Sequence, residues 1–472
     1  MHRPWQTMHS ASAGPADTPG DRPPKRYTDE DTRDPRPRWR ILWKCILIGA
    51  VSGFIVSLYR LLLEKTGGAA VEIFEYMREN PVWILLWIGS AVLAGYVIYR
   101  MVTWVPAASG SGIPQVKGNV MLGHRISGIP ILVVRFIGGA IGSIFGLSVG
   151  REGPSVHIGA AAADPIAKKV SEDDLEERIL LTSGAAAGLS AAFSAPISAM
   201  VFALEEIHHS FSEYVLIAGL ASAVVADIVA SLIFGMTPVL YFVPVPDIEL
   251  NIYIWLIPCA IAAGLLGWFM NRAYMYVRSL FKRVPGWVAI TAALLIALPV
   301  GLYIPEALGG GEGAVEIAER AEMTLLFMIT LLAVKMVFSC TSFGSGVPGG
   351  IFLPLMARGA VGGSAIGMAM SDIGMPDEYV CCCAVMCMAG TLASSLRTPV
   401  TAVLLVTEMT GSLVHLLPLA ICVLIAYAVS GLLGTRPIYR LLLNDIMESD
   451  PSIGENAGKT MGQLIREETS RA

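Results

Sequence analysis

Three pentapeptides that contain glycine and proline are the segments of this sequence best suited to binding an ion. They are Gly110–Pro114 (GSGIP), Gly150–Pro154 (GREGP) and Gly350–Pro354 (GIFLP). Glycine allows close approach to the backbone, and proline suits the first turn of a helix. A helix N-terminus offers free N–H groups and roughly half a positive charge. One such pentapeptide could be a plain turn or a helix contact, but three together favour an anion site built from converging helix ends.

Glu152, inside GREGP, is the candidate for both gating and proton uptake. Its carboxylate is itself an anion, so it could occupy the site in place of a permeating ion. Protonation would remove the charge and release the side chain. The alternative interpretation is an ion pair between Glu152 and the neighbouring Arg151.

Glu205 and Glu206 end the apolar segment FSAPISAMVFALEE. Adjacent residues point about 100° apart on a helix, so one glutamate could face the interior while the other packs or caps elsewhere. An interior glutamate could pass protons toward Glu152. The alternative is a solvated helix end followed by His208 and His209, which are interpreted as part of a solvent-exposed loop.

A few other polar residues lie near the broken or apolar segments. Ser111 in GSGIP offers a hydroxyl donor, and Tyr439 offers a phenolic donor after the last long apolar segment. A lone tyrosine at such a place is more typical of the interfacial aromatic belt. Arg135 and Lys335 could supply long-range positive potential, and Glu408 is interpreted as structural.

The composition places these residues in a membrane protein. Of 472 residues, 54% are hydrophobic and only 15% are charged, whereas a soluble protein has about 25% charged residues. The net charge of -5 adds little, because most ionisable residues lie in tails and loops. We therefore expect an all-α polytopic membrane protein, and we exclude a soluble enzyme, a nucleic-acid binder and a disulfide scaffold.

Apolar segments long enough to approach the span of a bilayer recur along the chain. They lie near residues 41–63, 82–105, 129–149, 213–234, 251–271, 286–303, 323–339 and 413–434. Regions 150–207 and 344–410 are also apolar, but Gly, Pro and Ser divide them into pieces that we expect to be about 10–14 residues long, too short to span alone. Broken helices in both halves of a chain indicate a transporter binding site.

The domain organisation follows from these segments. Residues 1–39 read as a polar, disordered tail, and the basic residues at the first membrane entry predict that this tail is cytoplasmic. Residues 40–440 form the transmembrane domain, with halves near 40–240 and 250–440. Residues 441–472 are expected to form a short polar tail.

The sequence gives little support for a metal site, a nucleotide site or an enzyme active site. The eight cysteines lie in apolar stretches without histidine at metal-ligand spacing, so they are interpreted as packing residues, and no metal site or cofactor is expected. Residues 454–460 imitate a phosphate-binding loop with the wrong glycine spacing, and residues 309–314 imitate a dinucleotide fingerprint without a βαβ unit. HExxH and GxSxG motifs do not occur in the sequence, so we expect no enzyme.

The ordered motifs resemble the CLC family of chloride channels and proton-coupled chloride transporters. The resemblance rests on GSGIP (110–114), GREGPSVHIGA (150–160), SGAAAGLSAAFSAPISAMVFALEE (183–206), GSGVPGGIFLP (344–354) and PIY (437–439). It covers about residues 40–440. It implies a fold of eighteen mostly tilted, broken helices in two inverted-topology repeats, and a homodimer with one pore per subunit.

The resemblance also implies roles for individual residues. Ser111 and Tyr439 would bind the central chloride through their hydroxyls, and Ile351 and Phe352 through their backbone N–H groups. Glu152 would be the gating glutamate and Glu206 the internal proton glutamate. The remaining backbone of the pore would come from Gly110, Gly112, Gly150, Arg151, Gly153 and Gly350.

The function that the resemblance implies is antiport of chloride and protons. A passive chloride channel, gated by voltage or protons, is the alternative with the same pore. Serine at position 111 goes with chloride rather than nitrate in this family. The paired cytoplasmic CBS domains of many members do not occur in the sequence, and this compact form suggests the inner membrane of a bacterium.

Overall fold

The computed structural model describes residues 39–122, 128–208, 212–236, 239–240, 246 and 248–449. Within these residues the protein is helical throughout, without a β-strand, and has seventeen α-helices where the resemblance implies eighteen. Nearly all of the predicted N-terminal tail, His209 and residues 450–472 lie outside the described residues.

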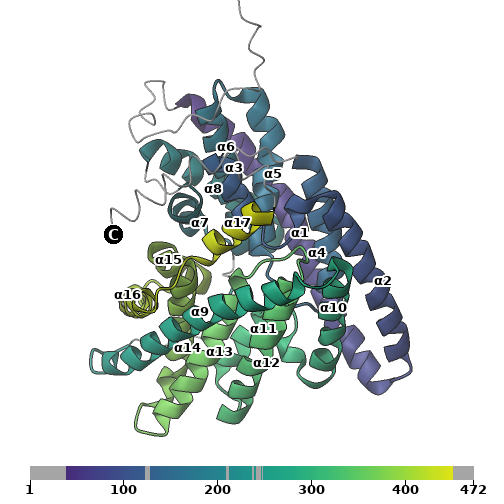
Figure 1. Ribbon diagram of the computed structural model, residues 1–472. Helices are drawn as coiled ribbons and strands as arrows, with labels where there is room; N and C mark the ends of the chain where they lie inside the picture. Colours follow the sequence, from purple (N-terminus) through teal and green to yellow (C-terminus); the bar gives the residue numbers. More distant parts are fainter. Residues whose placement is uncertain are drawn as a thin grey trace, which may run out of the picture.

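The first group of helices runs from α1 to α8 (Figure 1). Their bounds are α1 Trp39–Glu79, α2 Trp83–Trp104, α3 Ile113–Leu122, α4 Gly128–Ile144, α5 Glu152–Val170, α6 Asp174–Phe193, α7 Pro196–Phe202 and α8 Glu213–Phe234. A short 3-10 turn, η1 (Pro106–Ala108), precedes α3, and a π-helical segment, η2 (Ala203–His208), continues α7.

The second group runs from α9 to α16 and is followed by α17. Their bounds are α9 Tyr253–Phe281, α10 Gly286–Tyr303, α11 Glu312–Arg320, α12 Leu325–Gly344, α13 Phe352–Ser371, α14 Val380–Leu396, α15 Pro399–Thr410, α16 Leu416–Leu432 and α17 Ile438–Ser449. Two 3-10 turns, η3 (Pro305–Ala307) and η4 (Asp377–Tyr379), precede α11 and α14.

Eight of the described helices are long and apolar enough to cross a bilayer. They are α1, α2, α8, α9, α10, α12, α13 and the continuous segment of η4 with α14. Outer helices such as α2 and α8 leave large apolar side chains exposed, including Leu85 and Leu232. Apolar surface of this kind suits contact with lipid, and the chain is a multi-pass integral membrane protein.

The two groups of helices repeat one pattern of packing. α1 packs on α8 as α9 packs on α16, and α5 packs on α6 as α13 packs on α14. Each group has a 3-10 turn after its second helix, at η1 and η3. The groups meet where α2 packs on α10 and where α13 contacts α5. The chain therefore folds as two structurally matched halves.

The central helices are longer than we expected. We expected fragments of about 10–14 residues in regions 150–207 and 344–410, and this is wrong for α5, α6, α13 and α14, which have 17–20 residues. Glycine allows these helices to approach one another closely: a Cβ on Gly159 would lie 2.2 Å from the Gly184 carbonyl oxygen. Only the seven-residue α7 is shorter than the expected fragments, and the 12-residue α15 matches them.

The C-terminal helix α17, yellow in Figure 1, crosses the boundary that we predicted at residue 440. Leu442 and Leu443 are buried, and the helix packs against α3. Asp445 forms ion pairs with Arg278, at 2.7 Å, and with Lys282. Residues 441–449 therefore belong to the packed helical domain rather than to a polar tail.

The cysteines pack as small apolar residues. All eight are free thiols, and seven of them are buried. The Cys387 thiol donates a hydrogen bond to the backbone oxygen of Cys259 at 3.2 Å, where α14 packs on α9. The described residues contain no cluster of His, Cys, Asp or Glu that could hold a metal ion.

Candidate functional site

The two matched halves meet at a backbone contact between Gly150 and Gly350. Each N–H donates to the other residue's carbonyl oxygen, and both N–O distances are 2.7 Å. This is the pattern of an antiparallel bridge, in which two residues exchange both backbone hydrogen bonds. Directly after these glycines begin α5, at Glu152, and α13, at Phe352. The contact therefore brings the N-termini of two helices together in the protein interior.

The GSGIP loop is held against the second half of the chain. Gly110 and Gly112 have positive φ angles of 64° and 94°, which favour glycine. The Gly349 N–H donates to the Gly110 carbonyl oxygen at 3.1 Å, and the Ser109 hydroxyl donates to the Gly346 carbonyl oxygen at 3.0 Å. The loop ends where α3 begins, which adds a third helix N-terminus to the site.

Ser111 and Tyr439 carry buried hydroxyl groups that have no hydrogen-bond partner among the described residues. The two side chains lie close enough to interact, and a Cβ on Gly153 would lie 2.4 Å from the Ser111 hydroxyl oxygen. Tyr439 is completely buried, so its placement in an interfacial aromatic belt is wrong. Buried hydroxyls rarely stay unpaired. This pair therefore leaves two donors available for an anion at the helix ends.

Ile351 and Phe352 lie at the start of α13. Both are buried, and the Phe352 ring packs against the rings of Phe193 and Phe202 with centroid distances of 5.7 and 5.9 Å. The rings exclude water, while the first N–H groups of α13 have no partner within the helix. The site therefore combines polar donors with apolar walls.

The Glu152 carboxylate occupies the N-terminus of α13. One oxygen, Oε2, accepts a hydrogen bond from the Leu353 N–H at 3.4 Å, and the other, Oε1, has no partner among the described residues. A Cβ on Gly150 would lie 2.2 Å from Oε2, so glycine is required for this position of the side chain. A buried carboxylate thus sits where the helix end would attract an anion.

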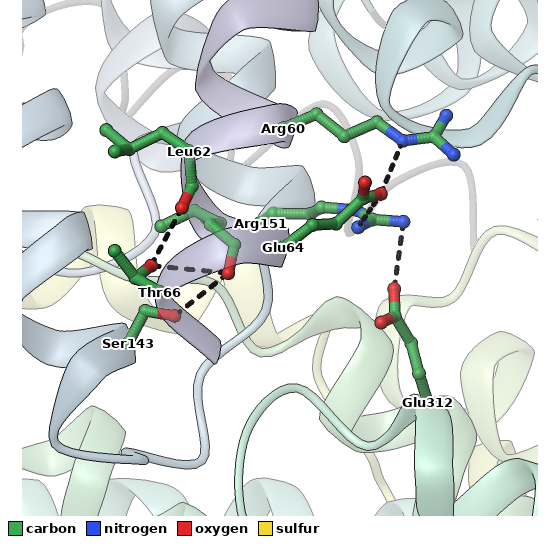
Figure 2. A network of polar contacts seen from close by, with 8 residues as sticks. Arg60, Leu62, Glu64, Thr66, Ser143, Arg151 and Glu312 are labelled. Atoms are coloured by element: carbon green, nitrogen blue, oxygen red, sulfur yellow. Dashed lines mark hydrogen bonds and ion pairs between the residues drawn. The ribbon is translucent and has the colours of Figure 1, made fainter. Parts of the chain in front are cut away.

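Arg151 does not form the ion pair with Glu152 that was the alternative interpretation. Its two terminal nitrogens bind Glu64, at 3.0 Å, and Glu312, at 2.8 Å (Figure 2). Gly150, Arg151 and Leu353 also line a cavity of about 320 Å³ beside the Glu152 segment. Arg151 therefore lines this cavity and directly precedes the gating candidate in the chain.

Three other cations are buried in the same region and have no carboxylate within ion-pair distance among the described residues. Arg135 donates to the Gly110 carbonyl oxygen, and Lys335 donates to those of Ala307 and Gly309 at 3.0 and 3.1 Å. Arg358, in α13, donates to the Pro354 carbonyl oxygen at 2.7 Å. Their charges are uncompensated by protein carboxylates, and sequence reasoning did not identify Arg358. Positive charge in a low-dielectric interior stabilises a bound anion.

Glu206 forms a buried ion pair with Lys117, a residue that sequence reasoning missed. The Nζ–Oε1 distance is 2.8 Å, and both side chains are at least 95% buried. Glu206 lies in η2, and Lys117 lies in α3, one turn after the GSGIP loop. Its position so close to GSGIP was the sequence feature from which Lys117 could have been identified. Tyr439 lies within electrostatic range of both Glu206 and Glu152, so the two glutamates flank the same residue.

Glu205 points away from this neighbourhood and caps a helix. Its Oε2 accepts hydrogen bonds from the Thr401 N–H at 2.9 Å and the Thr401 hydroxyl at 2.8 Å, at the start of α15. Glu408 does the same for α7, where it accepts from the N–H groups of Ile197 at 3.1 Å and Ser198 at 2.7 Å. The structural interpretation of Glu408 therefore agrees with its contacts.

Comparison with known sequences gives consistent matches. A family model described as "Voltage gated chloride channel" matches residues 90–431. A Vibrio campbellii protein named H(+)/Cl(-) exchange transporter ClcA is 31% identical over 428 residues, covering 87% of this chain and 90% of that protein. The protein of the same name from Salmonella paratyphi B is 32% identical over 422 residues, covering 84% and 88%.

Solved structures with the same architecture are also found. The crystal structure of a slow cyanobacterial Cl-/H+ antiporter matches with a TM-score of 0.80 and 24% identity, over 89% of this chain and all of that chain. A CLC-type fluoride/proton antiporter matches with a TM-score of 0.68 and 22% identity, over 83% of this chain and 95% of that chain. At these identities the likeness establishes the fold.

Proposed function

Because the chain belongs to the CLC family of voltage-gated chloride channels and related transporters, we propose that it exchanges chloride for protons across a membrane. Family membership agrees with the resemblance seen in the sequence and with the expectation that the protein is a transporter rather than an enzyme. Relatives at 31–32% identity are named exchangers of protons and chloride. The antiport activity of this chain is inferred from those relatives.

The observation that carries the proposal is the pair of unpartnered hydroxyls at converging helix ends. Ser111 and Tyr439 would donate hydrogen bonds to a chloride ion, together with the backbone N–H groups of Ile351 and Phe352. The positive charge of Arg135 and of the other buried cations without counter-ions would stabilise the ion at longer range. Hydrogen-bond donors that hold chloride without a cation in direct contact bind the ion with moderate affinity, and this allows its release.

Glu152 would act as the gate at the outer end of this site. Ionised, its carboxylate occupies the N-terminus of α13 and accepts from Leu353. Protonated, it loses the charge that favours this place, so the side chain would leave and chloride would enter. A hydrogen bond as long as 3.4 Å is weak, and this suits a side chain that must move.

Glu206 would exchange protons with Glu152 from the other end of the pathway. It is buried, titratable and electrostatically linked to Tyr439, as Glu152 is. Water or a side-chain movement would have to complete the route between the two glutamates. Glu205 is unsuited to this role because both of its contacts serve the cap of α15.

The alternative function is a passive chloride channel with the same pore. Purified protein in liposomes separates the two functions: an imposed chloride gradient should drive protons against their own gradient if the protein is an exchanger. Chloride movement without proton movement would establish the channel.

Two substitutions test the roles of the glutamates in the same liposomes. Glu206→Gln should abolish proton movement but leave chloride flux, since the amide cannot titrate. Glu152→Gln should uncouple protons as well, and chloride flux should lose its dependence on pH. If Glu152→Gln moved protons at the rate of the unsubstituted protein, Glu152 would have no part in the mechanism.

The cellular setting extends the same proposal. We place the protein in the inner membrane of a bacterium, with a cytoplasmic N-terminus and two copies of the chain, each with its own pore. The relatives named ClcA are bacterial proteins. Cross-linking in native membranes would test the dimer, and labelling of a cysteine introduced before Trp39 would test the orientation.

A further inference from the structure

We propose that Glu64 and Glu312 are positioning residues that occupy the Arg151 guanidinium and so keep it from pairing with Glu152. This inference rests on the gating role of Glu152 proposed above. Glu64 belongs to α1, in the first half of the chain, and Glu312 begins α11, in the second half. The two carboxylates therefore hold Arg151 from both halves at once.

The geometry of Arg151 supports this role. The residue is 7% exposed, and Figure 2 shows its side chain between Glu64 and Glu312. One terminal nitrogen binds Glu64 at 3.0 Å and the other binds Glu312 at 2.8 Å, while Nε has no partner among the described residues. Each terminal nitrogen of the guanidinium thus already has a carboxylate partner.

The residue that follows Arg151 in the chain is itself an acid, Glu152, whose Oε1 has no hydrogen-bond partner among the described residues. A buried guanidinium without a counter-ion is costly, so it takes an available carboxylate. If Glu64 and Glu312 lost their charges, Arg151 would turn to Glu152. The resulting ion pair would hold Glu152 ionised, and the gate would open only at lower pH.

The other charged and titratable groups near Arg151 form no ion pair with it within the described residues. Arg60, one turn before Glu64, donates to the same Glu64 oxygen at 2.9 Å, and its guanidinium stacks 4.0 Å from the Phe234 ring centroid. Lys335 is bound to backbone carbonyl groups. Tyr59 and Glu306 line the cavity, and neither forms an ion pair with Arg151 within the described residues.

The test measures chloride flux from liposomes across a range of pH. Glu312→Gln alone is the milder change, because this side chain is half exposed and Glu64 remains. In Glu64→Gln/Glu312→Gln, the pH of half-maximal flux should fall by about one to three units, the effect of an opposite charge at close range. Addition of Arg151→Gln to the double variant should restore the original pH of half-maximal flux.

Glu316→Gln is the matched control, because Glu316 lies on the same helix and pairs only with exposed Arg320. It should leave the pH profile unchanged. A folded double variant with the original profile, or a profile that Arg151→Gln does not restore, would overturn the inference. If the unsubstituted protein instead showed chloride flux independent of pH, the gating role of Glu152 would fail first, so the two failures can be told apart.

Discussion

At the scale of single residues, the ion-pair partner of Glu206 determines how readily this glutamate binds and releases a proton. Lys117 Nζ lies 2.8 Å from the Glu206 carboxylate, and both side chains are buried. A buried ion pair favours the charged form of each partner, whereas a lone buried carboxylate tends to bind a proton. Lys117 should therefore allow Glu206 to release the proton that it receives.

Lys117→Met should reduce proton movement while chloride flux continues, since Glu206 would keep its proton. Lys117→Arg should preserve coupling because it keeps the charge. The measurement is the ratio of protons to chloride ions moved in liposomes.

Lys168→Met is the control, because the half-exposed Lys168 also forms an ion pair with a buried carboxylate, that of Asp164, at 2.7 Å. A Lys117→Met protein that retained the full ratio would show that Lys117 has no influence on proton transfer.

At the scale of elements, the segments of α7 and α15 each supply a glutamate that caps the N-terminus of the other helix, across the two halves. Glu205, at the end of the α7 segment, caps α15, and Glu408, near the end of α15, caps α7. In the sequence, nine positions separate Pro196 from Glu205 and Pro399 from Glu408. The internal repeat of the two halves is thus visible in the sequence at these helices as well as in the GREGP and GIFLP pentapeptides. We had assigned both glutamates without comparing their spacing from the prolines that precede them.

Loss of either cap should destabilise the protein to a similar extent. Glu205→Ala and Glu408→Ala each remove acceptors from a helix N-terminus, which costs about 0.5–2 kcal/mol. The measurement is the thermal unfolding of the detergent-solubilised protein.

Glu75→Ala is a suitable reference, since Glu75 is exposed on α1 and its side chain forms no hydrogen bond or ion pair among the described residues. Unfolding temperatures of both cap variants equal to that of the reference would contradict the reciprocal capping.

At the scale of the whole molecule, the sequence alone was sufficient for the class of protein and for the helices that face lipid. Long apolar runs are local features, so segments such as 213–234 coincide with α8. The length of α5 and α13 was not predictable in this way, because the close contacts of their glycines with neighbouring helices are not visible in the sequence. Pairs such as Lys117–Glu206 and Arg151–Glu312 depend on where distant helices meet.

The contact between the halves gives the last prediction. A Cβ on Gly350 would lie 3.0 Å from the Gly153 nitrogen and 3.1 Å from the Gly150 oxygen, both of them backbone atoms. A Cβ on Gly150 would chiefly meet the movable Glu152 carboxylate. Alanine at position 350 should therefore disturb the junction of the halves, whereas alanine at position 150 should chiefly displace the gate.

Gly350→Ala should accordingly lower both thermal stability, by about 1–3 kcal/mol for an overpacked interior, and chloride flux. Gly150→Ala should affect the pH dependence of flux more than stability. Gly89→Ala is the control, because Gly89 lies within α2 with no other atom within 4 Å of an added Cβ. Equal stability of Gly350→Ala and Gly89→Ala would mean that the reciprocal bonds of Gly150 and Gly350 do not set how the halves join, since a methyl group at position 350 cannot fit without shifting them.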